Sequence, residues 1–125
     1  MNIVLTASDE PLYLQIYAQI RDQIIRGELA SGYCLPPIRT VARELRISVI
    51  TIKKAWEELE RDGYILTRVG RGCFVAPLQD GELDHRRYNL VREKLSNDIA
   101  YCKTVGLTKE DVLDLVGRLY EEEEL

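Results

Sequence analysis

Two helical patterns separated by only three residues constrain the fold of this chain most strongly. Apolar residues recur with helical spacing over residues 38–45 and again after Ser48, and the second pattern ends at Asp62. Serine commonly caps helix N-termini, so we expect the later helix to begin directly after Ser48. A three-residue connection leaves room only for a tight turn, which predicts a helix-turn-helix.

A longer amphipathic helix is predicted before this pair. Apolar residues recur every four positions over residues 12–24. Pro11 suits the first turn of this helix, and Ser8 or Asp9 is the expected cap. The Gly- and Pro-rich segment 32–37 that follows predicts a loop.

A β-hairpin is predicted after the helix-turn-helix. Two β-prone runs, residues 64–69 and 73–76, flank a glycine-rich turn at residues 70–72. Three helices followed by a hairpin are the layout of a winged helix-turn-helix. We therefore assign the chain to the α+β class, with a winged helix-turn-helix domain at residues 1–78.

Residues 79–125 predict a second segment that contains two helices. Residues 79–81 are expected to form a linker and residues 82–104 a long helix, while Thr108 and Asp111 form a reciprocal cap at the start of a shorter one. The shorter helix covers at most half of the long helix's apolar stripe, so we expect a second copy of the chain to cover the rest. The alternative is that both helices pack on the winged domain of the same chain. The expected dimerisation residues are Leu83, Leu90, Val91, Leu95, Ile99, Val112, Leu115, Val116 and Leu119.

The net charge of −4 is distributed unevenly. Residues 79–125 carry −5, including the run Glu121–Glu124, which we interpret as a solvated acidic tail. Residues 1–78 carry +1, and within them residues 38–72 carry +3. The acidic total therefore does not argue against a nucleic-acid partner for the winged domain.

Few residues are candidates for metal binding or catalysis. The spacing of the three cysteines and His85 matches no zinc site, so no metal is expected, and without a signal peptide the thiols are expected to be reduced. The sequence has no Gly-rich phosphate loop and no nucleophile with a base nearby, so we expect no catalytic residue and no cofactor. No apolar run is long enough for a membrane helix, and a cytoplasmic protein is expected. The cysteines are Cys34, Cys73 and Cys102.

Five short motifs resemble the GntR family of bacterial transcription regulators. They occur in the family's order and spacing, and they cover about residues 10–76. The short segment after them resembles the YtrA-type subfamily, in which two C-terminal helices dimerise and no larger effector-binding domain is present. The motifs are PLYLQI at residues 11–16, LPPIR at 35–39, VAREL at 41–45, LERDGYI at 59–65 and GRGCFV at 70–75.

This resemblance implies that the helix after Ser48 enters the major groove of DNA and that the hairpin tip holds the backbone or minor groove. Lys54 shares the exposed face of that helix and joins the implied contacts as a further candidate. The implied contacts are Arg39, Ser48, Val49, Ile50, Thr51, Lys53, Gly70 and Arg71.

Val49 and Ile50 stand where family members usually carry polar residues or arginine. We expect Ile50 to meet thymine methyl groups in the major groove. Val49 lies on the apolar stripe with Ile52 and Trp56, so core packing is the favoured alternative to groove contact for it. The β-branched residues of this turn disfavour a helix, and packing of Ile52 and Trp56 must override that preference.

These patterns predict a homodimeric, DNA-binding transcription regulator, most simply a repressor that blocks promoter access at a near-palindromic operator. The alternative is a winged-helix module that binds proteins through its acidic helical tail. A steep loss of DNA binding with added salt would favour the regulator, because phosphate contacts release counterions. No residue can be assigned to a small-molecule effector site.

Overall fold

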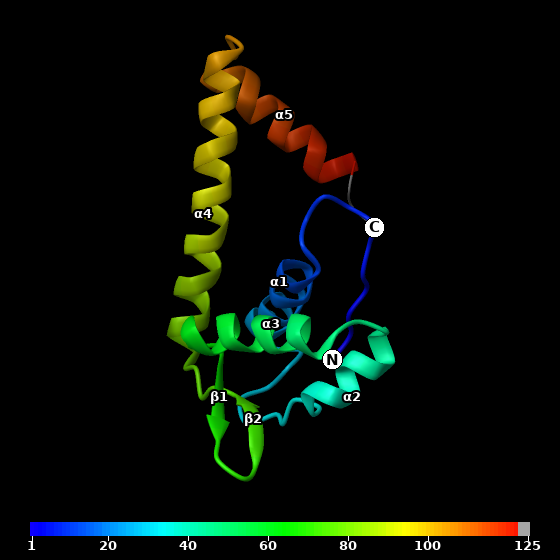
Figure 1. Ribbon diagram of the computed structural model, residues 1–125. Coiled ribbons are helices and arrows are strands. Elements are labelled where there is room, and N and C mark those ends of the chain that lie inside the picture. The colour runs from blue at the N-terminus through cyan, green and yellow to red at the C-terminus, as the bar shows by residue number, and fades with distance from the viewer. Residues whose placement is uncertain (123–125) are drawn as a thin grey trace. The chain divides into compact units, whose positions relative to one another are not determined.

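The structure, a computed structural model, describes residues 1–122, which form five helices and one two-stranded sheet. The chain divides by its internal contacts into two units, Met1–Asp84 and His85–Leu125. In chain order, the elements are α1 (Leu12–Ile25), α2 (Ile38–Leu45), α3 (Val49–Arg61), β1 (Ile65–Arg68), β2 (Gly72–Val75), α4 (Asp80–Thr104) and α5 (Lys109–Glu122), as Figure 1 shows.

The predicted helix-turn-helix is confirmed. α2 has the expected bounds, and α3 begins directly after Ser48, whose hydroxyl accepts a hydrogen bond from the main-chain N–H of Thr51 at 3.2 Å. Arg46 ends α2 in a left-handed conformation with φ 57°, and the N–H of Ile47 then donates to the carbonyl of Ala42 at 3.0 Å. This left-handed residue turns the chain sharply enough for α3 to start three residues later, at Val49.

The predicted cap of α1 is wrong. Pro11 itself is the N-cap residue, and no side chain caps the helix. The hydroxyl of Ser8 instead accepts from the N–H of Glu10 and from the side-chain amide of Gln15, each at 3.3 Å. Ser8 is therefore committed to the bend that precedes the helix, three residues too early to cap it.

The hydrophobic core lies where α1 packs against α3. Ile16 and Ile20 of α1 and Ile52 and Leu59 of α3 are completely buried. Tyr17 adds a polar contact, because its hydroxyl donates to the carboxylate of Asp62 just after α3. Burial, followed by this hydrogen bond, raises the pKa of Tyr17, so the hydroxyl stays protonated and acts as the donor.

The hairpin forms as predicted, with β1 and β2 antiparallel and Ile65 opposite Val75. The segment predicted as a loop before α2 also joins this sheet. Cys34 forms a bridge to Phe74, and the N–H of Leu35 donates to the carbonyl of Cys73 at 2.9 Å. The base of the hairpin is thereby tied to the chain that leads into α2.

The two C-terminal helices match the sequence prediction except at the N-terminus of α4. Residues 79–81 are not a linker, because α4 already begins at Asp80. The carbonyl of Gln79 accepts a hydrogen bond from the N–H of Glu82 at 3.0 Å. Acidic residues in the first turn also favour this helix N-terminus. The reciprocal cap of α5 is confirmed by bonds of 3.0 and 3.2 Å between Thr108 and Asp111, and bonds to Thr108 lower the pKa of Asp111. Across residues 1–122, no helix combines the length and hydrophobicity needed to cross a membrane.

Candidate nucleic-acid interface

α3 has one buried face and one exposed face. The buried face packs into the core through Ile52, Ala55, Trp56 and Leu59. Ile50 and Lys53 lie on the exposed face, and the side chain of Ile50 is 77% exposed although it is a large aliphatic residue. Val49 is half-buried, which favours the packing alternative for this residue.

The first turn of α3 also presents a fixed pair of hydroxyl groups. The Ser48 hydroxyl lies 2.8 Å from that of Thr51, and both belong to the cap of the helix. Main-chain N–H groups of a first helical turn and such hydroxyls are typical donors to phosphate oxygens. The exposed aliphatic surface of Ile50 lies between these two hydrogen-bonding residues in the sequence.

Lys54 differs from its neighbour Lys53. Its ammonium lies 4.1 Å from the centroid of the Tyr13 ring, in a cation–π contact between α3 and α1. This contact directs the Lys54 side chain toward α1. Lys53 is also exposed, but among residues 1–122 no comparable side-chain contact is recorded for it.

Two arginines of residues 38–72 differ in their surroundings. Arg39 is exposed at the second position of α2, the first helix of the helix-turn-helix. Arg61 lies at the other end of α3, where it forms ion pairs with Glu58 and with Asp62. Arg39 therefore adds positive charge at the N-terminal end of α2, whereas the charge of Arg61 is locally neutralised.

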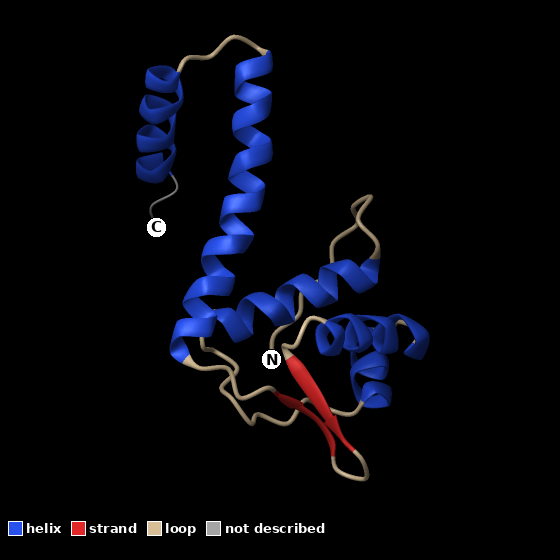
Figure 2. Cartoon of the chain, turned by 90° about the vertical axis from the view of Figure 1, so that its left-hand side faces the viewer, coloured by secondary structure: helices blue, strands red, loops and turns tan. Residues whose placement is uncertain are grey.

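The tip of the hairpin is the second exposed feature of this unit. Gly70 and Gly72 adopt positive φ angles of 75° and 116°, which the turn requires, and Arg71 lies between them with its side chain exposed. Figure 2 shows the two strands and their turn extending beyond the helices of the first unit. The sequence interpretation missed Arg68, whose carbonyl accepts the Arg71 N–H at 2.9 Å, and Val69, which is 98% exposed. Their position beside the glycine turn is the signal that could have found them.

The predicted dimerisation residues leave apolar surface uncovered. Neither α4 nor α5 contains a buried residue. An open apolar groove of about 430 Å³ lies at the corner between the two helices. Leu83, Leu90 and Val112 are half-buried, and the exposed members of the predicted set are Val91, Leu95, Ile99, Leu115, Val116 and Leu119.

Among the described residues, the cysteines and the acidic run do not form a common site. The three cysteines are free thiols, and within residues 1–122 no three or more His, Cys, Asp or Glu side chains are grouped as metal ligands would be. Of the acidic run, Glu121 and Glu122 are exposed in α5, while Glu123 and Glu124 lie outside the described residues.

Three helices, a tight turn before the third and a basic hairpin define a winged helix-turn-helix protein. Residues 12–75 match the family described as bacterial regulatory proteins of the gntR family. Together with the relatives below, this match shows that the chain belongs to the GntR family.

Two relatives from Bacillus subtilis (strain 168) are similar over most of their length. The chain is 37% identical to YhcF, named an uncharacterized HTH-type transcriptional regulator, over 86% of this chain and 88% of YhcF. It is 30% identical to YtrA, named an HTH-type transcriptional repressor, over 90% of this chain and 86% of YtrA.

Two solved structures are also similar. A GntR family transcriptional regulator from Listeria monocytogenes matches 90% of this chain and 98% of that chain, with a TM-score of 0.80 and 25% identity. AraR(DBD), solved in complex with operator ORR3, matches 61% of this chain and 92% of that chain, with a TM-score of 0.52 and 25% identity.

Proposed function

We propose that this chain is a homodimeric, sequence-specific transcription regulator of the bacterial cytoplasm, acting without catalysis as a repressor at a near-palindromic operator. One observation carries the proposal: the exposed Ser48 and Ile50 at the start of α3 and the exposed basic hairpin tip belong to the same compact unit. The repressor name of YtrA and the operator bound by AraR(DBD) support it by analogy.

In this proposal, residues 1–78 bind DNA and residues 79–125 dimerise. α3 enters the major groove, and the hairpin tip contacts the backbone or the minor groove. Arg68 and Val69 join the set because they are exposed beside the tip. The proposed contacts from the sequence are Arg39, Ser48, Val49, Ile50, Thr51, Lys53, Lys54, Gly70 and Arg71.

The uncovered apolar residues of α4 and α5 support dimerisation through these helices. Leu95 and Ile99 are large aliphatic residues that remain exposed on one face of α4, and Leu115 and Leu119 do so on α5. Apolar stripes of this extent on soluble helices are normally buried against another surface. A two-fold dimer places two recognition helices on successive major grooves, which requires an operator with two related half-sites.

Selection of bound sequences from a random double-stranded DNA library at physiological salt tests this function. We expect enriched sequences that contain two inverted half-sites about one helical turn apart. Enrichment of no sequence, together with capture of a protein by the acidic helices, would instead establish a protein-binding module.

Replacing Arg71 with alanine is expected to weaken binding to all DNA sequences and to reduce its salt dependence. Each lost phosphate contact lowers the slope of log affinity against log salt by about 0.9, so a dimer should lose about 2. Fluorescence anisotropy on the selected duplex measures this slope. Arg61→Ala is the matched control, because Arg61 is already paired with Glu58 and Asp62. Equal slopes for Arg71→Ala and the unmodified protein would contradict a phosphate contact.

Ile50 is expected to discriminate thymine from deoxyuridine, which lacks only the 5-methyl group. Burial of one methyl group against Ile50 stabilises the complex by about 0.8 kcal/mol, or about fourfold in affinity per half-site. The Ile50→Ala variant should bind both duplexes equally, whereas Lys53→Ala should keep the discrimination. Identical dT-to-dU ratios for Ile50→Ala and the unmodified protein would refute the contact.

A further inference from the structure

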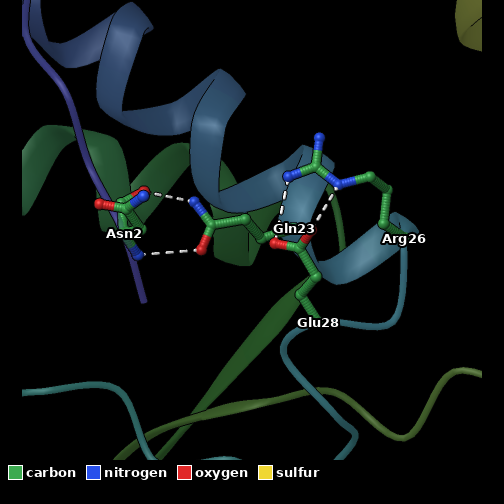
Figure 3. Close-up of polar contacts among 4 residues, drawn as sticks. All are labelled: Asn2, Gln23, Arg26 and Glu28. Atoms are coloured by element: carbon green, nitrogen blue, oxygen red, sulfur yellow. Dashed lines mark hydrogen bonds and ion pairs between the residues drawn. The ribbon is translucent and has the colours of Figure 1, made fainter. Parts of the chain in front are cut away.

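Residues 2–6, which we call the strap, lie extended along α1 and are bound there through their main chain. The middle contact shows the pattern: the N–H of Val4 donates to Oε1 of Gln19 at 2.8 Å, and Nε2 of Gln19 donates back to the Val4 carbonyl at 2.7 Å. The same two-bond contact occurs three times, pairing Gln23 with Asn2, Gln19 with Val4 and Gln15 with Thr6. Figure 3 shows the contact between Gln23 and Asn2.

The spacing of the three glutamines, which we call the amide ladder, suits an extended chain. Four residues of a helix rise about 6 Å, and two residues of a strand about 6.6 Å. Side chains at Gln15, Gln19 and Gln23 therefore meet every second residue of an antiparallel strand, and their two methylene groups absorb the small difference. A carboxamide offers one donor group and one acceptor, which match the N–H and C=O that a strand residue directs to one side.

The strap has the alternation of a β-strand. Asn2, Val4 and Thr6 have exposed side chains, whereas Ile3 and Leu5 are half-buried. Among residues 1–122 the structure records no hydrogen bond from the amides of Ile3 or Leu5, which alternate with the bound ones. The amide ladder thus contacts main-chain atoms at every second residue, and the side chains there are exposed; of these, the Thr6 hydroxyl also donates to Oε1 of Gln15 at 3.4 Å.

The strap is separable from the core. All buried apolar side chains within the described residues lie between Ile16 and Val75. The chain also bends back between strap and helix, where Nε2 of Gln15 donates to the Glu10 carbonyl at 3.0 Å. Release of the strap would therefore expose polar amides on α1 without removing a residue of the core.

We propose that Gln15, Gln19 and Gln23 form a binding site for an extended peptide main chain, and that residues 2–6 occupy it as a clasp that binds and releases as one unit. The site recognises main-chain N–H and C=O groups two residues apart, so it tolerates changes in the outward side chains. This inference does not depend on DNA binding.

Amide hydrogen exchange on the full chain, measured by NMR, tests the clasp. We expect slow exchange at Val4 and Thr6 and fast exchange at Ile3 and Leu5. Gln19→Met has a side chain of similar length without the donor or the acceptor, and it should lower protection at least tenfold at Thr6 as well as at Val4, because the clasp releases as a unit. Loss of protection at Val4 alone, or equal protection along residues 2–6, would overturn the proposal.

A synthetic peptide of residues 1–7 tests main-chain recognition in trans, on a chain that begins at Ser8 and keeps the whole core. A peptide N-methylated at Leu5 should bind as well as the unmodified peptide, because that amide does not face the ladder. N-methylation at Val4 should weaken binding at least tenfold, and alanine at Val4 should leave it within twofold. If both methylations weakened peptide binding equally, the glutamines would not be recognising the peptide main chain.

Discussion

Replacing Ile52 with alanine is expected to lower the free energy of unfolding of the first unit by about 2–5 kcal/mol. The same change at Ile50 is expected to alter it by less than about 0.5 kcal/mol. Both residues are isoleucines of α3, two positions apart, but Ile52 is completely buried and Ile50 is 77% exposed. The difference arises because alanine at Ile52 leaves a cavity between α1 and α3, whereas at Ile50 it removes only solvated atoms.

Denaturant unfolding followed by the fluorescence of Trp56, the single tryptophan, measures both changes. Trp56 lies on the same buried face of α3 as Ile52 and reports on the first unit. Ile50→Ala serves as the matched control for Ile52→Ala. A loss of stability of equal size at both positions would mean that Ile50 packs in the core, and the proposed groove-facing surface of α3 would then be wrong.

Replacing Ile99 with aspartate is expected to produce a monomer and to weaken operator binding at least about 100-fold. Ile99 is exposed on α4 and borders the groove at the corner with α5. A carboxylate at this position must lose its hydration when a second copy covers the helix, which costs several kcal/mol per ion. A monomer engages one half-site only, and about 2.7 kcal/mol of lost binding free energy corresponds to 100-fold.

Sedimentation velocity at micromolar concentration and anisotropy on the selected duplex measure the two effects together. Asn97→Asp adds the same charge to an exposed position of α4 outside the apolar stripe, and it should change neither. The unfolding of the first unit, followed by Trp56, should be unaffected in both variants. An Ile99→Asp protein that remains dimeric would show that the dimer does not use this face.

Local sequence signals predicted most of the helix-turn-helix because they act over a few residues. The Ser48 cap and the reciprocal cap of Thr108 and Asp111 need only neighbouring main-chain groups, so their sequence patterns were sufficient. The cap of α1 failed for the opposite reason. Ser8 has the right chemistry, but Gln15 and the following bend use it elsewhere.

The contacts that the sequence did not predict join segments distant along the chain. Gln15, Gln19 and Gln23 have a visible four-residue period, yet nothing local indicates that residues 2–6 pair with them. The bridge between Cys34 and Phe74 likewise links a predicted loop to the hairpin over 40 residues. Such contacts depend on where folding places each segment, and a single sequence carries no pairwise signal for them.

The sequence alone determined the winged helix-turn-helix, the bounds of α2 and the unequal charge of the two halves, because residue type and spacing decide these properties locally. Only the tertiary structure distinguished between the core and groove alternatives for Val49, which is half-buried, and it showed that the strap is held by its main chain. Burial depends on the partner that a helix meets, here α1, and the partner is chosen by the packing of the whole unit.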